Sequence, residues 1–255
     1  MRMGREEVCM RVDREEVMAS LQFVALVLVL FLLPDEELDV LFGLNPQRVW
    51  LVVVFIAGLS FVGSLLAKAV APRTAIGVMG VVGGCVSPGL TIMSFVDQTK
   101  RYAEFDRTYA FAAAIAVTML FPRNLVVFGI VSPSLTRSVL LPFVAMTGVS
   151  VAVTGLLWSR LRTREPPTSE LDTSFQLRPA LVFGAVIAVI LLVINNFDLS
   201  LPSDTIRVGI VLGTVSEIPV YIGITWTART MKIVRVIAII LLGSASVGIP
   251  LVLLT

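Results

Sequence analysis

The chain has 255 residues, of which 56% are hydrophobic and only 15% are charged, and its mean hydropathy is +0.93. A soluble domain cannot bury so much apolar surface, so the composition excludes that class and predicts an integral membrane protein in contact with the lipid bilayer. The net charge of +2 gives no basis for a nucleic-acid partner, and the absence of histidine excludes imidazole-based catalysis and metal ligation.

A charged leader, residues 1–17, opens the chain and repeats the string REEV. Its many acidic residues do not fit a cleavable signal peptide, which has a basic start and a small-residue cleavage site. We therefore interpret the leader as cytoplasmic or interfacial, and residues 18–255 as one membrane domain. Cys9 in the leader and Cys85 in an apolar run are not expected to form a disulfide.

Apolar runs close to the length of a membrane span follow one another after the leader. Hydrocarbon about 30 Å thick requires roughly 20 apolar residues of helix. The runs lack the alternation of barrel strands, so the predicted fold class is all-α. We expect a polytopic transmembrane helix bundle of seven to eight hydrophobic segments in the cell (inner or plasma) membrane. The candidate segments are 17–33, 49–67, 74–96, 108–130, 139–159, 179–194, 206–228 and 233–254.

The third segment, residues 74–96, is dense in glycine and proline. One interpretation is a broken or re-entrant backbone, because these residues weaken a helix. The other is close helix packing through small residues four apart, such as Gly80 and Gly84. Simple alternation of eight spans places more Lys and Arg outside than inside, against the positive-inside rule. If this segment enters and leaves on one side, most basic residues lie on the leader's side.

The sequence also suggests an internal repeat between the two halves of the chain. A shift of 129 residues aligns Gly84 and Ser87 with Gly213 and Ser216, so that two GxVS strings coincide. In many transporters the equivalent segments of such repeats hold the substrate. The alignment predicts repeats of four segments each, over residues 18–130 and 139–255.

Only two charged residues lie within the apolar segments, Arg123 and Glu217. Burying either charge is costly unless it is paired or hydrated, so both are candidates for a substrate or ion site. Alternatively, Arg123 could reach a headgroup by snorkelling, and whether the two residues meet is left open. The hydroxyl and glycine positions around the aligned strings complete the predicted site: Ser87, Thr91, Ser216, Gly83, Gly84 and Gly213. These groups suit cations or water, and the identity of any metal is unknown.

Enzyme chemistry is not expected. The aspartates lie in the leader or in connections, and the chain has no glycine-rich phosphate-binding loop ending in Lys-Ser or Lys-Thr. We predict no cofactor.

Several stretches resemble one family of membrane domains. They are REEVMASLQFVALVLVLFLLP, GVVGGCVSPGLTI, MLFPRNLVVFGIVSPSL and FQLRPALVFGAV. They are similar to the C-terminal membrane domain of unknown function of MgtC/SapB-like proteins. The chain departs from that pattern at Pro88 and at Glu217, where the family carries Ser-Ser-Thr-Ala and two aspartates. The resemblance implies a prokaryotic inner-membrane protein, linked by name to magnesium homeostasis, whose partner is a separate MgtC-like membrane protein or a second copy of the chain.

Two functions are compatible with these features. The leading hypothesis is a small-solute or cation transporter-like protein whose third and seventh segments form a central site. The alternative is a non-transporting membrane subunit or regulator that binds partner membrane proteins through small-residue faces. A hydrated cavity that reaches Glu217 or the glycines of the third segment would favour the first hypothesis.

Overall fold

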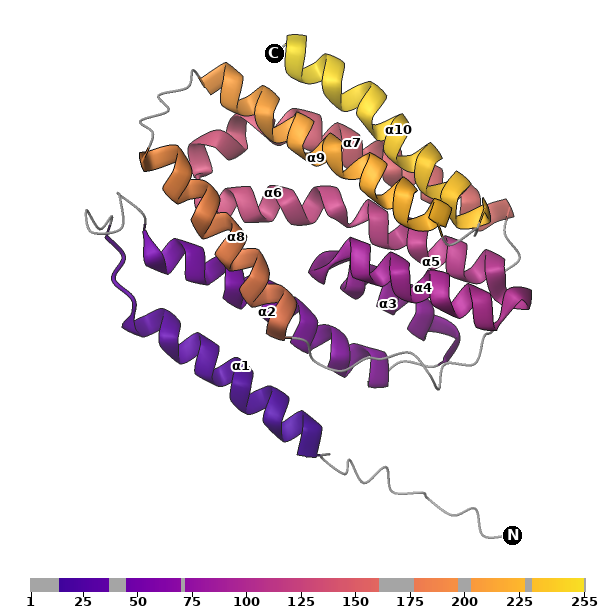
Figure 1. Ribbon diagram of the computed structural model, residues 1–255, viewed down its shortest axis with the longest axis horizontal. Coiled ribbons are helices and arrows are strands. Elements are labelled where there is room, and N and C mark those ends of the chain that lie inside the picture. The colour runs from indigo at the N-terminus through magenta and orange to yellow at the C-terminus, as the bar shows by residue number, and fades with distance from the viewer. Residues whose placement is uncertain are drawn as a thin grey trace.

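The computed structural model describes residues 14–36, 45–69, 72–160, 177–196, 203–227 and 231–254 (Figure 1). Every regular element in these ranges is a helix, in agreement with the all-α prediction. The elements are α1 (Arg14–Leu32), α2 (Pro46–Ala69), α3 (Pro72–Val86), α4 (Pro88–Arg101), the 3-10 turn η2 (Ala103–Phe105), α5 (Asp106–Thr118), α6 (Leu120–Val131), α7 (Pro133–Arg160), α8 (Leu177–Asn196), α9 (Ser203–Thr227) and α10 (Met231–Leu254). Most of the leader lies outside the described residues.

Prolines mark where several helices begin. Helices α2, α3, α4 and α7 all start at a proline. Proline lacks the backbone N–H, but at the first position of a helix this group would have no intrahelical acceptor, so no hydrogen bond is lost. The string VSPxLT occurs twice. The first copy separates α3 from α4 at Ser87, and the second separates α6 from α7 at Ser132. In both copies the threonine hydroxyl donates a 2.9 Å hydrogen bond to the serine carbonyl. The same local sequence therefore produces both breaks.

Helices α5 and α6 form one kinked path across the bundle. Met119 separates them, and Pro122 follows in the first turn of α6. Proline removes one hydrogen bond and clashes with the preceding turn, which accounts for the interruption. The residue after it is Arg123, so the kink sets the place at which this cation enters the interior.

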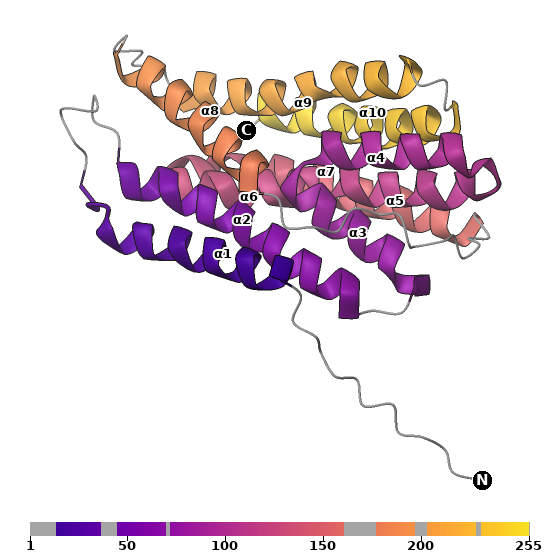
Figure 2. The same ribbon diagram turned by 60° about the horizontal axis from the view of Figure 1, so that its bottom comes forward.

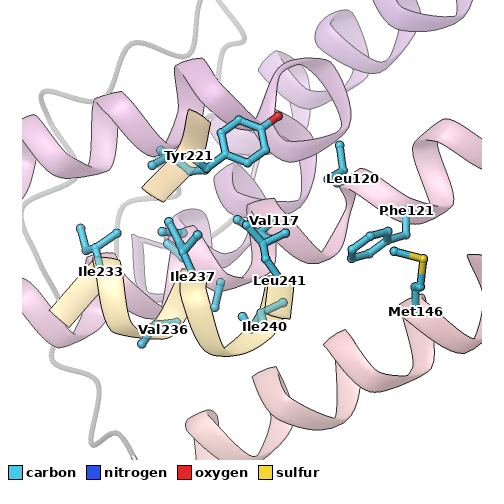
Figure 3. Close-up of a cluster of buried hydrophobic side chains, with 14 of the residues drawn as sticks. Val117, Leu120, Phe121, Met146, Tyr221, Ile233, Val236, Ile237, Ile240 and Leu241 are labelled. Atoms are coloured by element: carbon cyan, nitrogen blue, oxygen red, sulfur yellow. The ribbon is translucent and has the colours of Figure 1, made fainter. Parts of the chain in front are cut away.

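Helix α5 is the centre of the larger of two apolar clusters. Its alanines are almost fully buried, and α3, α4, α7 and α10 pack around it. A Cβ atom added to Gly84 of α3 would lie 2.5 Å from the carbonyl oxygen of Ala116, so only glycine permits this approach. Figure 3 shows another part of the cluster, where Ile237 and Leu241 of α10 lie beside Val117 of α5.

The smaller cluster joins α1, α2 and α8 to the end of α6. Val52, Ile56 and Ala57 of α2 form its centre and are fully buried. The Trp50 indole nitrogen donates a hydrogen bond to the Leu26 carbonyl of α1 at 2.9 Å. The bundle thus consists of two apolar packing units that share α6.

The outer surface of the bundle is apolar, as lipid contact requires. Many large hydrophobic side chains of α1, α7, α8 and α10 are more than half exposed. Exposed Trp158 and Trp226 lie in the last turns of α7 and α9, where interfacial tryptophans are common. These features support insertion in a membrane.

The described helices confirm only part of the predicted number of spans. Five helices of the described part are long and apolar enough to cross a bilayer, and the seven to eight predicted spans are not confirmed. The apolar parts of α1 and α8 are shorter than a full span, and the third predicted segment is divided between α3 and α4. The five candidate spans are Pro46–Leu66, Ala103–Val131, Thr136–Trp158, Thr205–Gly223 and Met231–Leu253.

Helices α3 and α4 form a hairpin inside the bundle. Figures 1 and 2 show α3 running inward from the end where α2 finishes, and α4 returning to that same end, where α5 begins. An ion pair between Lys232 and Asp106 brings the start of α10 to this end as well. Lys100 and Arg101 lie in the last turn of α4, so basic residues gather here. This same-end hairpin is compatible with the re-entrant arrangement that the charge distribution favours.

The predicted four-segment repeat is not confirmed. Residues 74–96 are broken at Ser87, whereas the aligned residues 203–225 belong to α9, which is helical through Ser216. The Ser216 hydroxyl donates a hydrogen bond to the Gly213 carbonyl at 2.6 Å within that helix. Similar apolar strings thus adopt different backbones, because Pro88 follows Ser87 whereas Glu217 follows Ser216.

The hairpin predicts which faces of the membrane are accessible. In a background without native cysteines, we expect Lys100→Cys and Met231→Cys to react with an impermeant maleimide from one side of sealed vesicles. Asp35→Cys, near the opposite end of the bundle, should react only from the other side. Labelling of Lys100→Cys and Asp35→Cys from the same side would refute the same-end hairpin.

The close approach of α3 to α5 predicts a difference between two glycines that the sequence aligns. Gly84→Ala should destabilise the protein by about 1 to 3 kcal/mol, because backbone atoms of Ala116 cannot move away from the new methyl group. Gly213→Ala is the matched control: nothing lies within 4 Å of its added Cβ, and alanine favours helix. Thermal unfolding in detergent, followed by size-exclusion chromatography, measures both variants. Equal melting temperatures would contradict this packing.

Candidate functional site

The break between α3 and α4 supplies the backbone of the candidate site. Ser87 adopts extended geometry with φ −157° and ψ 97°, and its hydroxyl accepts the Leu90 N–H at 3.5 Å as the N-cap of α4. Its own N–H donates to the Gly83 carbonyl at 2.7 Å. A Cβ at Gly83 would lie 2.5 Å from the Thr91 hydroxyl oxygen, so this glycine lets the two helices close on each other. Gly83 and Thr91 therefore hold the hairpin together.

Arg123 reaches the end of α3 from α6. Its side chain is only 7% exposed, and one guanidinium nitrogen, Nη1, donates to the Val86 carbonyl at 3.3 Å. Nε and Nη2 both donate to Asn124 Oδ1, at 3.3 and 3.1 Å. The Phe183 ring of α8 lies 4.8 Å from the guanidinium carbon. A cation at a helix C-terminus and over an aromatic face is favourably placed, which offsets part of the cost of burial.

Glu217 of α9 lies on another side of the α3–α4 break. The carboxylate is half-buried and accepts a hydrogen bond from the Tyr221 hydroxyl, one helical turn further on, at 2.5 Å. Its charge is opposite to that of Arg123, which lines the same pocket. Within the described part of the chain no direct ion pair joins the two side chains. They face each other through a shared space.

That space is a cavity of about 900 Å³, open on one side. Its wall combines the Ser87 break, Arg123, the Glu217–Tyr221 pair, and the first three turns of α8. It lies at the seam between the two apolar clusters, because Tyr221 belongs to the larger one while Phe183 and Leu177 pack on the smaller one. The lining residues are Gln22, Val86, Ser87, Pro88, Leu90, Arg123, Leu177, Arg178, Val182, Phe183, Val186, Glu217 and Tyr221.

The eight predicted site residues fall into three places. Arg123, Glu217 and Ser87 line the cavity, whereas Gly83, Thr91 and Gly84 serve helix packing behind it. Gly213 and Ser216 lie on the exposed face of α9 and are not among the lining residues.

The third and seventh segments do meet, but not through their GxVS strings. A Cβ at Gly89 of α4 would lie 3.2 Å from the Tyr221 ring, and this is where α4 and α9 approach closely.

Sequence reasoning did not select several residues that shape the cavity. Tyr221 lies one helical turn from Glu217, and Asn124 directly follows Arg123, so local spacing could have indicated both. Arg178 and Phe183 belong to α8, and no sequence pattern places that helix beside α6. The described residues contain no cluster of three or more metal-ligating Cys, Asp or Glu side chains.

Comparison with known proteins places the chain in a family. No curated protein and no solved structure matches it. A family model described as a domain of unknown function, DUF4010, matches residues 54–248, which include every helix of the bundle except α1, the start of α2 and the end of α10. The match gives no link to MgtC/SapB proteins, so that part of the resemblance is not supported. The chain belongs to the DUF4010 family of domains of unknown function.

Proposed function

We propose that the chain is a transporter-like protein of the cell membrane that binds a small solute in the cavity beside the α3–α4 break. Broken helices whose ends meet inside the membrane are a common way for transporters to present backbone groups to a substrate. Here the break lies beside a buried cation and a half-buried carboxylate. Intramembrane charges of this kind are functional candidates, because their burial has a cost that packing alone does not require.

The observation that carries the proposal is the cavity itself. Its volume of about 900 Å³ lies within the range of roughly 300 to 1,000 Å³ that is typical of small-molecule sites. Apolar side chains form most of its wall, and a few polar groups converge on it, which is the usual composition of such sites. A protein that only binds partner helices does not need an internal space lined in this way.

A second candidate, a subunit that binds a partner helix or a second copy of the chain, is favoured by a different face. Gly209, Gly213 and Ser216 lie exposed along α9, and nothing approaches the two glycines within 4 Å of an added Cβ. Small residues at this spacing permit close contact between membrane helices. This face is distinct from the cavity, so the two candidates can be tested separately.

Filling the cavity should block solute uptake. Val182→Trp places a large side chain in the wall of the cavity, and Val189→Trp changes a residue of the same helix and similar exposure, 55% against 57%, that does not line it. We expect Val182→Trp to lower the initial uptake rate severalfold in proteoliposomes, and Val189→Trp to leave it unchanged. The probes are labelled sodium, magnesium, phosphate, benzoate and glycine.

Two results would contradict the proposal. One is the absence of wild-type uptake for every probe at verified protein incorporation. The other is equal uptake by the Val182→Trp and Val189→Trp proteins, since the cavity would then have no part in the transport. Either result would favour the partner-binding candidate, for which Gly213→Leu should disrupt association while Val182→Trp should not.

A further inference from the structure

More positive than negative side chains surround the cavity. Arg123 and Arg178 line it together with a single carboxylate, that of Glu217, so the described lining residues carry an excess of positive charge. The carboxylate already accepts the Tyr221 hydroxyl. The Arg123 guanidinium is buried and has no direct ion pair among the described residues, so the strongest unneutralised charge at the cavity is a cation.

Helix ends add to this asymmetry. Helix α4 begins at Pro88 and α8 begins at Leu177, and both residues line the cavity. The N-terminus of a helix carries a partial positive charge, which remains at the start of α4 although the Ser87 hydroxyl accepts the Leu90 N–H. Among the described helices α3 alone ends at the cavity, and its last carbonyl, that of Val86, already accepts a hydrogen bond from Arg123. The backbone therefore favours a negative ligand as the side chains do.

The remaining wall is apolar. Val182, Phe183 and Val186 of α8 and Leu90 of α4 contribute side chains, and three of them are about half exposed on the open side. An inorganic anion would leave this surface without a partner. A ligand with a charged head and an apolar body would cover it while the head reaches Arg123.

We infer that the ligand of this cavity is an amphiphilic anion, a carboxylate or phosphate attached to an apolar body. The inference rests on the proposed function and specifies its substrate class. Arg123 and the start of α4 bind the head, Arg178 attracts it near the surface, and α8 contacts the apolar body. The Glu217 carboxylate repels the head and limits affinity, so the ligand can leave again.

The test measures binding of decanoate and decyl phosphate to the purified full chain in neutral detergent by isothermal titration calorimetry. Decyltrimethylammonium, which has the same tail and the opposite charge, is the control ligand. We expect saturable binding of the two anions only. Arg178→Gln should weaken binding about threefold, as for a partly exposed ion pair, whereas Arg137→Gln, an exposed cation of α7 outside the cavity, should have no effect.

Glu217→Gln should change the affinity for anions in the opposite direction to Arg178→Gln. The amide keeps an acceptor for the Tyr221 hydroxyl and removes the negative charge, so anions should bind several times more tightly. A cation-binding site would instead lose affinity in this variant. Tighter binding of decyltrimethylammonium than of decanoate, or weaker decanoate binding in Glu217→Gln, would overturn the inference. Should Glu217→Gln fail to fold, exposed Arg178→Gln still tests the sign of the site.

The outcomes for the ligand class and for transport are separable. Anion binding with the expected variant effects, but without uptake, would support the ligand class and refute the transporter. Uptake of sodium or magnesium without anion binding would refute only the ligand class. Repeating the decanoate titration in nanodiscs identifies the source of the ligand. Competition by phosphatidylglycerol, but not by phosphatidylcholine, indicates that the natural ligand is a lipid headgroup. If phosphatidylglycerol does not compete, the natural ligand is a free organic anion. Either result supports the shared chemistry.

Discussion

A helix that stops inside a membrane must have its backbone polar groups satisfied by the protein itself. This constraint applies at Ser87, where α3 ends and α4 begins within the bundle. On the α4 side, the Ser87 hydroxyl and carbonyl accept hydrogen bonds from the Leu90 N–H and the Thr91 hydroxyl. On the α3 side, Arg123 donates to the last carbonyl of the helix. The arrangement of the surrounding helices follows from the need to bring these groups together.

The position of Arg123 has a cost that its contacts can offset. Placing an arginine at the centre of a membrane helix costs about 2.5 to 3.5 kcal/mol. A hydrogen bond that involves a charged group contributes about 1.5 to 3 kcal/mol, so the bonds to Val86 and Asn124 are sufficient in magnitude. No direct ion pair with Glu217 is needed to keep the cation in place. The carboxylate is therefore not required to neutralise Arg123.

Sequence reasoning located the helices well because lipid exposure leaves a strong signal. Each predicted segment coincides with a helix or, at residues 74–96 and 108–130, with a pair of helices. Glycine and proline content indicated the break, and the distribution of basic residues favoured the same-end hairpin. The two occurrences of VSPxLT show why the break itself is local: serine, proline and threonine at this spacing stop one helix and start the next wherever they occur.

Which residues face one another was harder to predict, because apolar helices carry little information about their partners. Gly84 and Gly213 align in sequence, yet one is pressed against the backbone of α5 and the other is exposed on α9. Length alone also leaves the number of spans unconfirmed, since the described apolar parts of α1 and α8 are shorter than a full span. The start of α8 beside Arg123 depends on its packing against α2, which no local motif encodes.

The division of the bundle into two apolar clusters bears on how a ligand could enter and leave. Residues within each cluster are closely packed, whereas the cavity interrupts packing at the seam between them. Away from the cavity the two clusters stay in close contact, because Gly63 of α2 lies directly against Val82 of α3. Helix α8 forms the cavity wall on the side of the smaller cluster, and Glu217 and Tyr221 form it on the other. Because α6 belongs to both clusters, a movement at the cavity would displace α8 and Phe183 relative to Glu217 and Tyr221, and would change the width of the cavity.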